Sequence, residues 1–349
     1  MNVKLEYEES KFIEFDAGRI TYFFGANHEI KWKLYRGLKR FSTGKSLSDL
    51  EENIYGDDGI NICIDGRMMK SRELPIYFLD CRASFLEQFQ LLKGSLMQEY
   101  LEGFEGDFET NKRIEKINDG LLNLEILLQK TVRSEFQHIV PMIREMNYGD
   151  IKKYLLELAF FEEETLYPVE MMDIGKLIDE YCQLLKMQLE KTQLESWVWI
   201  SNLNSFIAKS KFCDFVDKLK CIGDSTGLLK IFILSEDYLS LPYSYDDTSS
   251  TIVFYEEYQQ IPEFSFLKES IQRNYPDESF GSDELLLDSF YRILSYIGWD
   301  ESIQGKIYLK AKDMVLLKVV SQLLGSKMSY DFASTAGKIS KLEKIFLNN

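Results

Sequence analysis

The chain has 349 residues and a formal net charge of −16. Hydrophobic residues make up 45% and aromatic residues 14%, which is enough core material for one large or two smaller folded domains and excludes a disordered chain. Taken alone, the negative charge disfavours binding to DNA or to anionic membranes, because like charges repel each other. No apolar run reaches the length of a membrane span, so we expect no membrane partner.

The cysteines and the first residues point to one compartment. The five cysteines are scattered and form no C-x-x-C pair: Cys63, Cys81, Cys182, Cys213 and Cys221. They are typical of reduced thiols in a cytoplasmic protein. The N-terminal stretch that begins Met1-Asn-Val-Lys lacks the basic start and apolar core of a secretory signal. We therefore expect a cytoplasmic protein.

The first elements that the pattern predicts are strands and a helix. Phe12–Phe15 and Ile20–Phe24 are short apolar runs separated by Asp16-Ala-Gly, and this arrangement predicts a β-hairpin. A helix is expected from Glu29 to Phe41, because Ile30, Leu34, Leu38 and Phe41 recur on one face.

At the junction of the predicted strand Ile20–Phe24 and the predicted helix, the sequence has the pattern of a phosphate-binding loop that lacks two of its fixed residues. The working pattern is G-x-x-x-x-G-K-[ST]. Gly25 and Lys31 have the right spacing, but Ile30 stands at the second glycine and Trp32 at the magnesium-binding Ser or Thr. Isoleucine cannot let the backbone close on a phosphate, and tryptophan cannot hold the metal. We predict that the protein requires no ATP and is not an enzyme.

The predicted helix carries a row of cations that a phosphate backbone could use. From residue 30 to residue 45 the chain has no acid, and Lys33, Arg36 and Arg40 share one helix face. The candidate DNA-binding residues are Lys31, Lys33, Arg36, Lys39 and Arg40. A solvated helix face explains the same pattern, and both interpretations stay open. The lysine-rich stretch Lys306–Lys344 is a second candidate.

After the buried strand Pro75–Asp80, helical periodicity extends from Ser84 to Glu195. Two apolar seams recur at spacings of three and four, one from Ile114 to Ile139 and one from Ile174 to Gln188. Seams of this kind on two helices joined in sequence predict an antiparallel coiled coil.

An acidic triplet lies near the end of this arm. Glu162, Glu163 and Glu164 precede Pro168, where we expect the chain to turn back. Carboxylates gathered at a bend can hold calcium through oxygen ligands alone. A solvated acidic turn explains the triplet as well and is the interpretation that the sequence favours.

Strands and helices alternate again beyond the arm. We expect strands at Trp197–Ser201, Leu228–Leu234 and Thr251–Tyr255, with a helix at Lys211–Cys221. This alternation predicts an α/β fold with a mostly parallel sheet. Four further helices are expected near the C-terminus: Phe264–Gln272, Asp283–Ile297, Ile303–Leu324 and Phe332–Leu347.

Together these features resemble the large form of the type II-A CRISPR-associated protein that takes part in spacer acquisition. The resemblance covers Met1 to about Pro262, and its best match is the block from Glu195 to Phe206 followed by Leu228 to Tyr238. It implies a P-loop-like head domain at 1–83 and 196–262, a helical leg domain at 84–195 and a C-terminal extension at 263–349.

The resemblance also implies a function without catalysis. Members of this family form a homotetrameric ring that holds double-stranded DNA, preferably linear DNA with free ends, and work with other CRISPR adaptation proteins. By position, the cations listed above would line the ring. The family's short members bind calcium in the leg, close to where the glutamate triplet falls, so calcium is a possible ligand.

Two other functions remain open from the sequence. A divergent P-loop ATPase with coiled-coil arms would need Lys31 on the phosphates and Asp80 or Glu236 on magnesium. A protein-interaction scaffold would use the arm only for dimerisation.

Overall fold

The computed structural model describes residues 1–92, 94–104, 106–277, 280–299, 309–326 and 339–348. The chain divides into two compact units, one formed by 1–84 and 189–349 and the other by 85–188. The helices beyond residue 263 therefore belong to the first unit, and the second unit ends at residue 188 rather than at 195. No helix among the described residues is long and apolar enough to cross a membrane.

The centre of the first unit is a six-stranded sheet in the order β12-β11-β3-β10-β9-β6. All neighbours in it are parallel except β11 and β12. The strands are β3 (Ile20–Phe24), β6 (Ile76–Leu79), β9 (Ser196–Ser201), β10 (Leu229–Leu234), β11 (Thr251–Phe254) and β12 (Tyr258–Gln260). Each residue of β9 is buried, as expected for a parallel strand covered on both faces. The predicted α/β fold with a mostly parallel sheet is confirmed.

A second, antiparallel sheet packs against the first through an aromatic core. Its strand order is β2-β1-β4-β5, and its strands are β1 (Asn2–Glu8), β2 (Lys11–Asp16), β4 (Ile62–Ile64) and β5 (Arg67–Met68). Phe15 from β2 meets Phe23 edge-on, and Phe23 stacks on Trp199. The predicted hairpin of 12–24 is wrong, because β2 pairs with β1 while β3 enters the parallel sheet. The run Met1–Glu8 supplies the missing partner strand.

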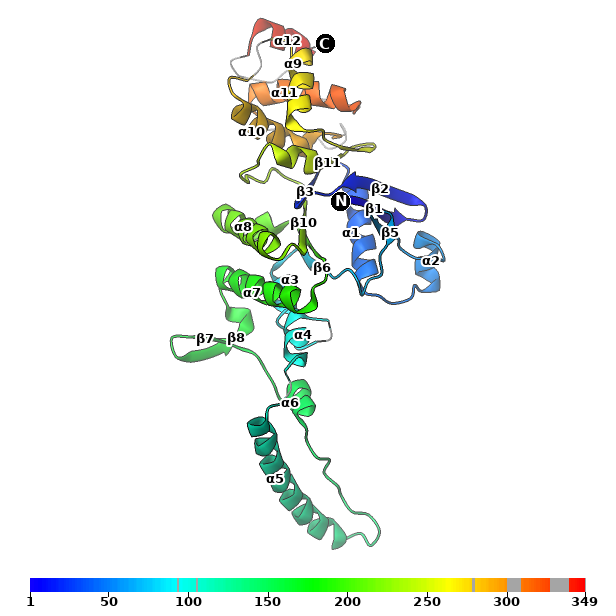
Figure 1. Cartoon of the computed structure of the whole chain (residues 1–349), viewed down its shortest axis with the longest axis vertical. Helices are drawn as coiled ribbons and strands as arrows, with labels where there is room; N and C mark the ends of the chain where they lie inside the picture. Colours follow the sequence, from blue (N-terminus) through cyan, green and yellow to red (C-terminus); the bar gives the residue numbers. More distant parts are fainter. Residues whose placement is uncertain (93, 105, 278–279, 300–308, 327–338, 349) are drawn as a thin grey trace. The chain divides into compact units, whose positions relative to one another are not determined.

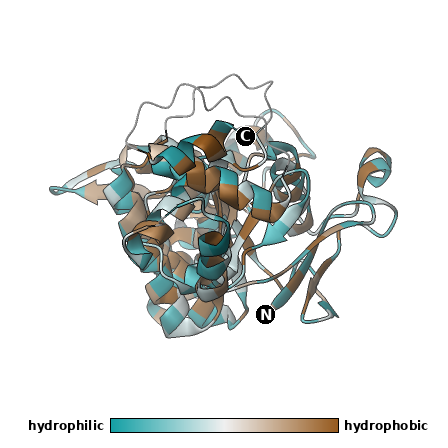
Figure 2. Cartoon of the chain, turned by 90° about the horizontal axis from the view of Figure 1, so that it is seen from above, coloured by the Kyte–Doolittle hydropathy of each residue, from teal (hydrophilic) through white to brown (hydrophobic). Residues whose placement is uncertain are grey.

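Helices cover the parallel sheet in the first unit (Figure 1). Helix α1 packs on β1 and β6, and α8 packs on β10. Figure 2 shows hydrophobic and hydrophilic residues alternating around the helices, the pattern of amphipathic helices with one buried side. The helices are α1 (His28–Ser42), α2 (Asp49–Tyr55), α3 (Arg82–Glu87), α8 (Lys209–Thr226), α9 (Phe264–Asn274), α10 (Asp283–Ile293), α11 (Ala311–Leu324) and α12 (Lys341–Asn348).

Two of the predicted C-terminal helices reach beyond the described residues. Helix α11 starts at Ala311, whereas residues 303–308 of the expected helix lie outside the described residues. The expected start at Phe332 also lies outside them, and α12 begins at Lys341. The helices expected at Phe264 and Asp283 are confirmed.

The second unit contains an arm built differently from the predicted coiled coil. Its helices are α4 (Leu96–Glu102), α5 (Phe108–Arg133), α6 (Tyr148–Tyr154) and α7 (Ile174–Thr192). Helix α5 ends at Arg133, and the chain returns beside it as an extended segment rather than as a second helix (Figure 1). Asn118 exchanges two hydrogen bonds with the backbone of Met146, and the Ile143 N–H donates to Glu125. The second helix expected from the periodicity is present as α7, but the described contacts of α5 are with this extended segment, so a coiled coil of the two is not shown.

A hairpin in the second unit was also missed by the helical periodicity. β7 (Ala159–Glu162) pairs with β8 (Thr165–Pro168) in antiparallel register. Glu163 and Glu164 form its turn with φ values of 47° and 61°. Two consecutive left-handed residues are the geometry of a tight hairpin turn.

Candidate nucleic-acid interface and phosphate loop

The loop after β3 lies at the position that open α/β sheets use for ligands. Numbered one to five in chain order, the strands other than β12 are β3, β6, β9, β10 and β11. Across the sheet they lie in the order five, one, four, three, two. The first strand is therefore flanked by the fifth and the fourth, and ligands in such sheets bind at the carboxyl ends of strands where the order switches. The loop after β3 therefore stands at such a switch point.

The backbone donors of this loop are occupied by carbonyl groups of the chain itself. The Ala26 N–H donates to the Ile297 carbonyl at 2.8 Å, and the Asn27 N–H donates to the Phe254 carbonyl at 3.2 Å. The Asn27 side chain caps α1 by accepting from the Ile30 N–H and also donates to the Tyr255 carbonyl. A phosphate would need these N–H groups free. Both N–H groups instead donate to carbonyl oxygens of the chain, one at Phe254 in β11 and one at Ile297.

Gly25 fixes this arrangement. Its φ is +94°, and a Cβ atom built there would lie 1.9 Å from the Phe254 carbonyl oxygen. Only glycine allows both this backbone conformation and such a close approach. Gly25 serves the packing of β11 against the loop, which is a different task from closing on a phosphate.

Lys31 points into the protein rather than toward solvent. Its side chain is 1% exposed, and its ammonium donates to the Ser235 carbonyl at 3.0 Å. Burial lowers the pKa of Lys31 to about 8, although the nearby charges of Glu236 and Asp237 oppose this shift. Lys31 is thus separated from the other four candidate cations, and the surface interface that we predicted does not include it.

The two candidate magnesium ligands are held by other partners. Glu236 lies 3.6 Å from Nδ1 of His28. Partial burial lowers the pKa of His28, with the charge of Lys31 adding to the shift and Glu236 opposing it. Asp80 directly follows β6. In the sheet, β9 and β10 lie between β6 and β3. It accepts a hydrogen bond from the Tyr35 hydroxyl at 2.6 Å. Burial raises the pKa of Asp80. The hydrogen bonds from Tyr35 and Cys81 and the charge of Lys39 together lower it by more, so the pKa of Asp80 lies below its usual value.

Three of the predicted interface cations share the outer side of α1 with an exposed tryptophan. Trp32 is 57% exposed, and the Arg36 guanidinium lies 4.5 Å from the centre of its ring. Lys39 lies 3.5 Å from Asp80, and Lys33 lies 3.0 Å from Glu8 and 2.6 Å from Glu29. We call Trp32, Lys33, Arg36 and Lys39 the α1 surface.

The sequence of α1 alone did not reveal the acids that lie beside the α1 surface. Glu8 comes from β1 and Asp80 from the end of β6, so only the fold brings them to the helix. Glu29 lies four residues before Lys33, and this spacing could have indicated the pair. The side chains of Lys33 and Glu8 are only 22% and 18% exposed, so a phosphate must compete with Glu8 for Lys33, whereas Lys39 beside Asp80 is 56% exposed.

Arg40 has a structural role. Its guanidinium contacts Glu51 with two nitrogens and also donates to the Thr43 hydroxyl and to the backbone carbonyls of Lys45 and Ser46. The hydrogen bond from Arg40, together with those from Ser48, lowers the pKa of Glu51 to about 2. Arg40 therefore ties the end of α1 to α2 and the connecting loop. In the second candidate stretch, Lys306–Lys344, the ammonium of Lys318 also makes internal contacts, because it donates to the carbonyls of Phe346 and Leu347.

The acidic triplet does not converge on one point. Glu162 pairs with Lys176, while Glu163 and Glu164 form the hairpin turn. The described residues contain no group of three or more His, Cys, Asp or Glu side chains that could hold a metal ion.

Comparison with solved structures places the whole chain in a known fold. Stu0660 of Streptococcus thermophilus is 18% identical, with a TM-score of 0.79 over 99% of each chain. CbiO1 from Clostridium perfringens, part of the ABC transporter complex cbiONQ, is 11% identical over 68% of this chain and 80% of its own, with a TM-score of 0.35. The recombination mediator RecF is 13% identical over 73% of this chain and 95% of its own, with a TM-score of 0.34.

No protein-family model and no curated protein sequence matches the chain. The fold shared with Stu0660 from end to end is what the comparisons establish.

Proposed function

We propose that this protein binds double-stranded DNA without catalysing a reaction, and that it acts in CRISPR spacer acquisition as the sequence resemblance implies. In this proposal a homotetrameric ring holds linear duplex DNA by its phosphates. The observation that carries it is the phosphate loop, whose donors bind the chain's own carbonyls. A loop whose backbone donors are bonded within the chain disfavours nucleotide turnover, and this supports the proposal.

The α1 surface supplies the DNA contacts in this proposal. Lys33, Arg36 and Lys39 carry the positive charge, and phosphate contacts of this kind need no particular base sequence. The side chain of Lys39 is 56% exposed, so it can turn to a phosphate without unfolding the helix. Lys31 and Arg40 are left out of this set because both serve internal contacts.

Self-association is supported by the arm. Helix α5 exposes leucines along much of its length, because the extended return segment covers only one side of it. The most exposed of them are Leu122 and Leu127, at 56% and 61%. Exposed apolar patches of this kind mark protein contacts, in agreement with a homotetramer.

The test is binding of the full-length protein to linear and to closed circular duplex DNA of the same sequence at low salt. We expect the linear form to be bound in preference, and light scattering to give the mass of a tetramer. Absence of binding to linear duplex at low salt would refute the proposal.

The divergent ATPase remains the second candidate because the strand order and Lys31 are in place. It requires that the loop open and that Lys31 leave the Ser235 carbonyl. Protection against thermal unfolding by ATP and magnesium, which binding to the folded state would produce, would favour it. We expect no such protection.

A further inference from the structure

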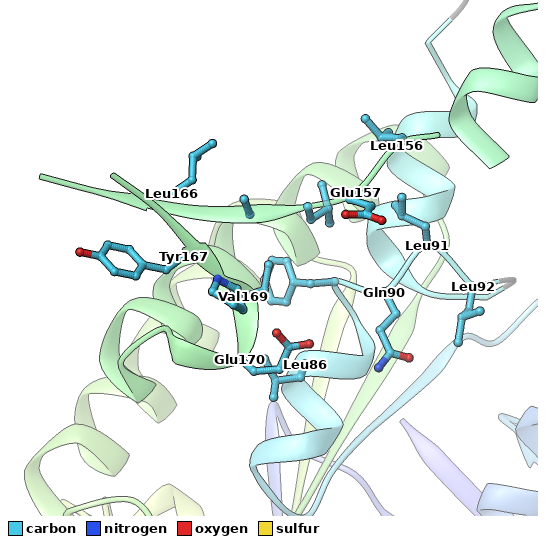
Figure 3. A pocket seen from close by; sticks show the side chains of 14 residues that line it. Leu86, Gln90, Leu91, Leu92, Leu156, Glu157, Leu166, Tyr167, Val169 and Glu170 are labelled. Carbon is cyan, nitrogen blue, oxygen red and sulfur yellow. The ribbon is translucent and has the colours of Figure 1, made fainter. Parts of the chain in front are cut away.

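A hollow of about 720 Å³ opens at the base of the β7–β8 hairpin, within the second unit. Its walls come from three pieces of chain (Figure 3): the end of α3 with the turn that follows, the approach to β7, and β8 with the residues after it. Leu86, Phe89, Leu156, Leu166 and Val169 make its lining mostly apolar. Phe89 is 8% exposed and forms part of a fixed wall.

The apolar surface continues outside the hollow. Leu92 and Leu166, which line the hollow, are 64% and 69% exposed. Leu155, Phe161 and Met171 lie within two residues of lining residues in the sequence and are 63–71% exposed. Surfaces of folded proteins seldom keep so many large apolar groups in water unless another molecule covers them.

The hairpin also offers backbone hydrogen bonds. Among the described residues β7 and β8 form a sheet of only two strands, so each strand has an outer edge without a partner strand. Such an edge can accept an extended peptide as a third strand. An apolar surface beside a strand edge fits an extended segment whose side chains point alternately to it and to solvent.

The charges select the chemistry of the occupant. Among the described residues, the acidic side chains that line the hollow are Glu157 and Glu170, and none of the described lining residues is basic. Glu163 and Glu164 add two carboxylates at the hairpin turn. A second copy of this chain, with a net charge of −16, is on average repelled by such a surface. A basic segment is attracted to it.

We propose that this surface binds an extended, basic segment of a partner protein. Apolar side chains of that segment enter the hollow, and a neighbouring lysine or arginine faces Glu157. This site is independent of the α1 surface and does not rest on DNA binding.

The test is a selection of short random peptides displayed on phage, with the full-length protein as bait. Enriched peptides are labelled with fluorescein, and their binding is measured by anisotropy. We expect them to share an apolar residue next to lysine or arginine. Leu166→Asp should weaken their binding by roughly tenfold or more, because anchors in pockets carry most of an interface's affinity.

Two matched variants keep the test specific. Leu50→Asp makes the same change at another exposed leucine, on α2, and should leave binding unchanged. Glu157→Lys should weaken binding roughly fivefold or more at low salt, whereas Glu115→Lys, on α5, should not, because only the former removes the facing charge.

Three results would overturn the proposal. The first is enrichment of peptides without basic residues, and the second is equal binding by the wild-type protein and Leu166→Asp. The third is a mass in solution that falls for Leu166→Asp alone, because a second copy would then cover this face.

Discussion

Lys31 has a different role in the structure from the one that its position in the sequence suggests. In the sequence it is the lysine of a nucleotide site, and in the structure it donates to the Ser235 carbonyl at the end of the neighbouring strand. Removing its charge from water costs free energy, and this cost is why its pKa falls to about 8.

The pKa of Lys31 predicts a pH dependence of stability. Between pH 8 and the ordinary value of 10.5, the unfolded chain binds a proton at this lysine that the folded chain does not bind, so the lysine's contribution to stability rises with pH. Below pH 8 the penalty of the buried charge is fully present. Replacing Lys31 by methionine, which has a similar length and no charge, removes this dependence.

We therefore expect the free energy of unfolding of the wild-type protein to gain on that of Lys31→Met by about 3 kcal/mol as pH rises from 8 to 10.5. Urea denaturation of both proteins at several pH values measures this difference. A difference that does not vary with pH would contradict the burial of a titrating lysine.

Gly25 carries a second prediction at the residue scale. Gly25→Ala places a methyl group against the Phe254 carbonyl and should destabilise the protein by roughly 3 kcal/mol or more, through backbone strain and displacement of β11. Gly66→Ala is the control, because Gly66 also has a positive φ of +79° but no neighbouring atom within 4 Å of an added Cβ. It should cost only about 1–2 kcal/mol, and equal losses in urea denaturation would count against the close approach at Gly25.

Among the elements, those with a strong local pattern were predictable from the sequence. β3, α1, β9 and β10 follow from apolar runs and helical spacing, and Asn27 is a recognisable helix cap. The partner of β2 was not predictable, because strand pairing depends on distant segments. The acids beside α1 and the carbonyls that fill the loop were missed for the same reason: Glu8, Asp80, Phe254 and Ile297 reach the site only through the fold.

The arm shows the limit of periodicity. Spacings of three and four predicted α5 correctly, but they also continue through Phe136 and Ile139, where the helix has ended. The return segment is held by side chains of α5 that cap its backbone, namely Asn118, Glu125 and Gln129. An apolar pattern cannot distinguish this arrangement from a helix pair.

Asn118→Ala tests that arrangement. The Asn118 side chain both donates to and accepts from the backbone of Met146, so its removal should free the return segment from α5. We expect amide hydrogen exchange of residues 142–146 to become roughly tenfold faster, as the loss of about 1–2 kcal/mol of local stability requires. Asn123→Ala, at an exposed position of the same helix, should leave exchange unchanged. Equal exchange in both variants would show that the segment is held in another way.

On the scale of the whole molecule, charge and function have to be reconciled. A chain with a net charge of −16 can hold DNA only where cations are gathered locally on its surface. The α1 surface gathers three cations, but its neighbouring acids offset them until DNA phosphates take their place. Binding should therefore be weak in one copy and strong in an oligomer that presents several α1 surfaces to one duplex.

The most direct test of the central claim is a salt series of equilibrium binding to linear duplex DNA. It compares the wild-type protein with a variant that carries Lys33→Glu, Arg36→Glu and Lys39→Glu. We expect the logarithm of the wild-type affinity to fall steeply and linearly with the logarithm of salt concentration, because each phosphate contact releases counterions. The variant, with its oligomeric mass unchanged, should bind more weakly and with a shallower slope. Equal affinity and equal slope in the two proteins would contradict the assignment of the α1 surface.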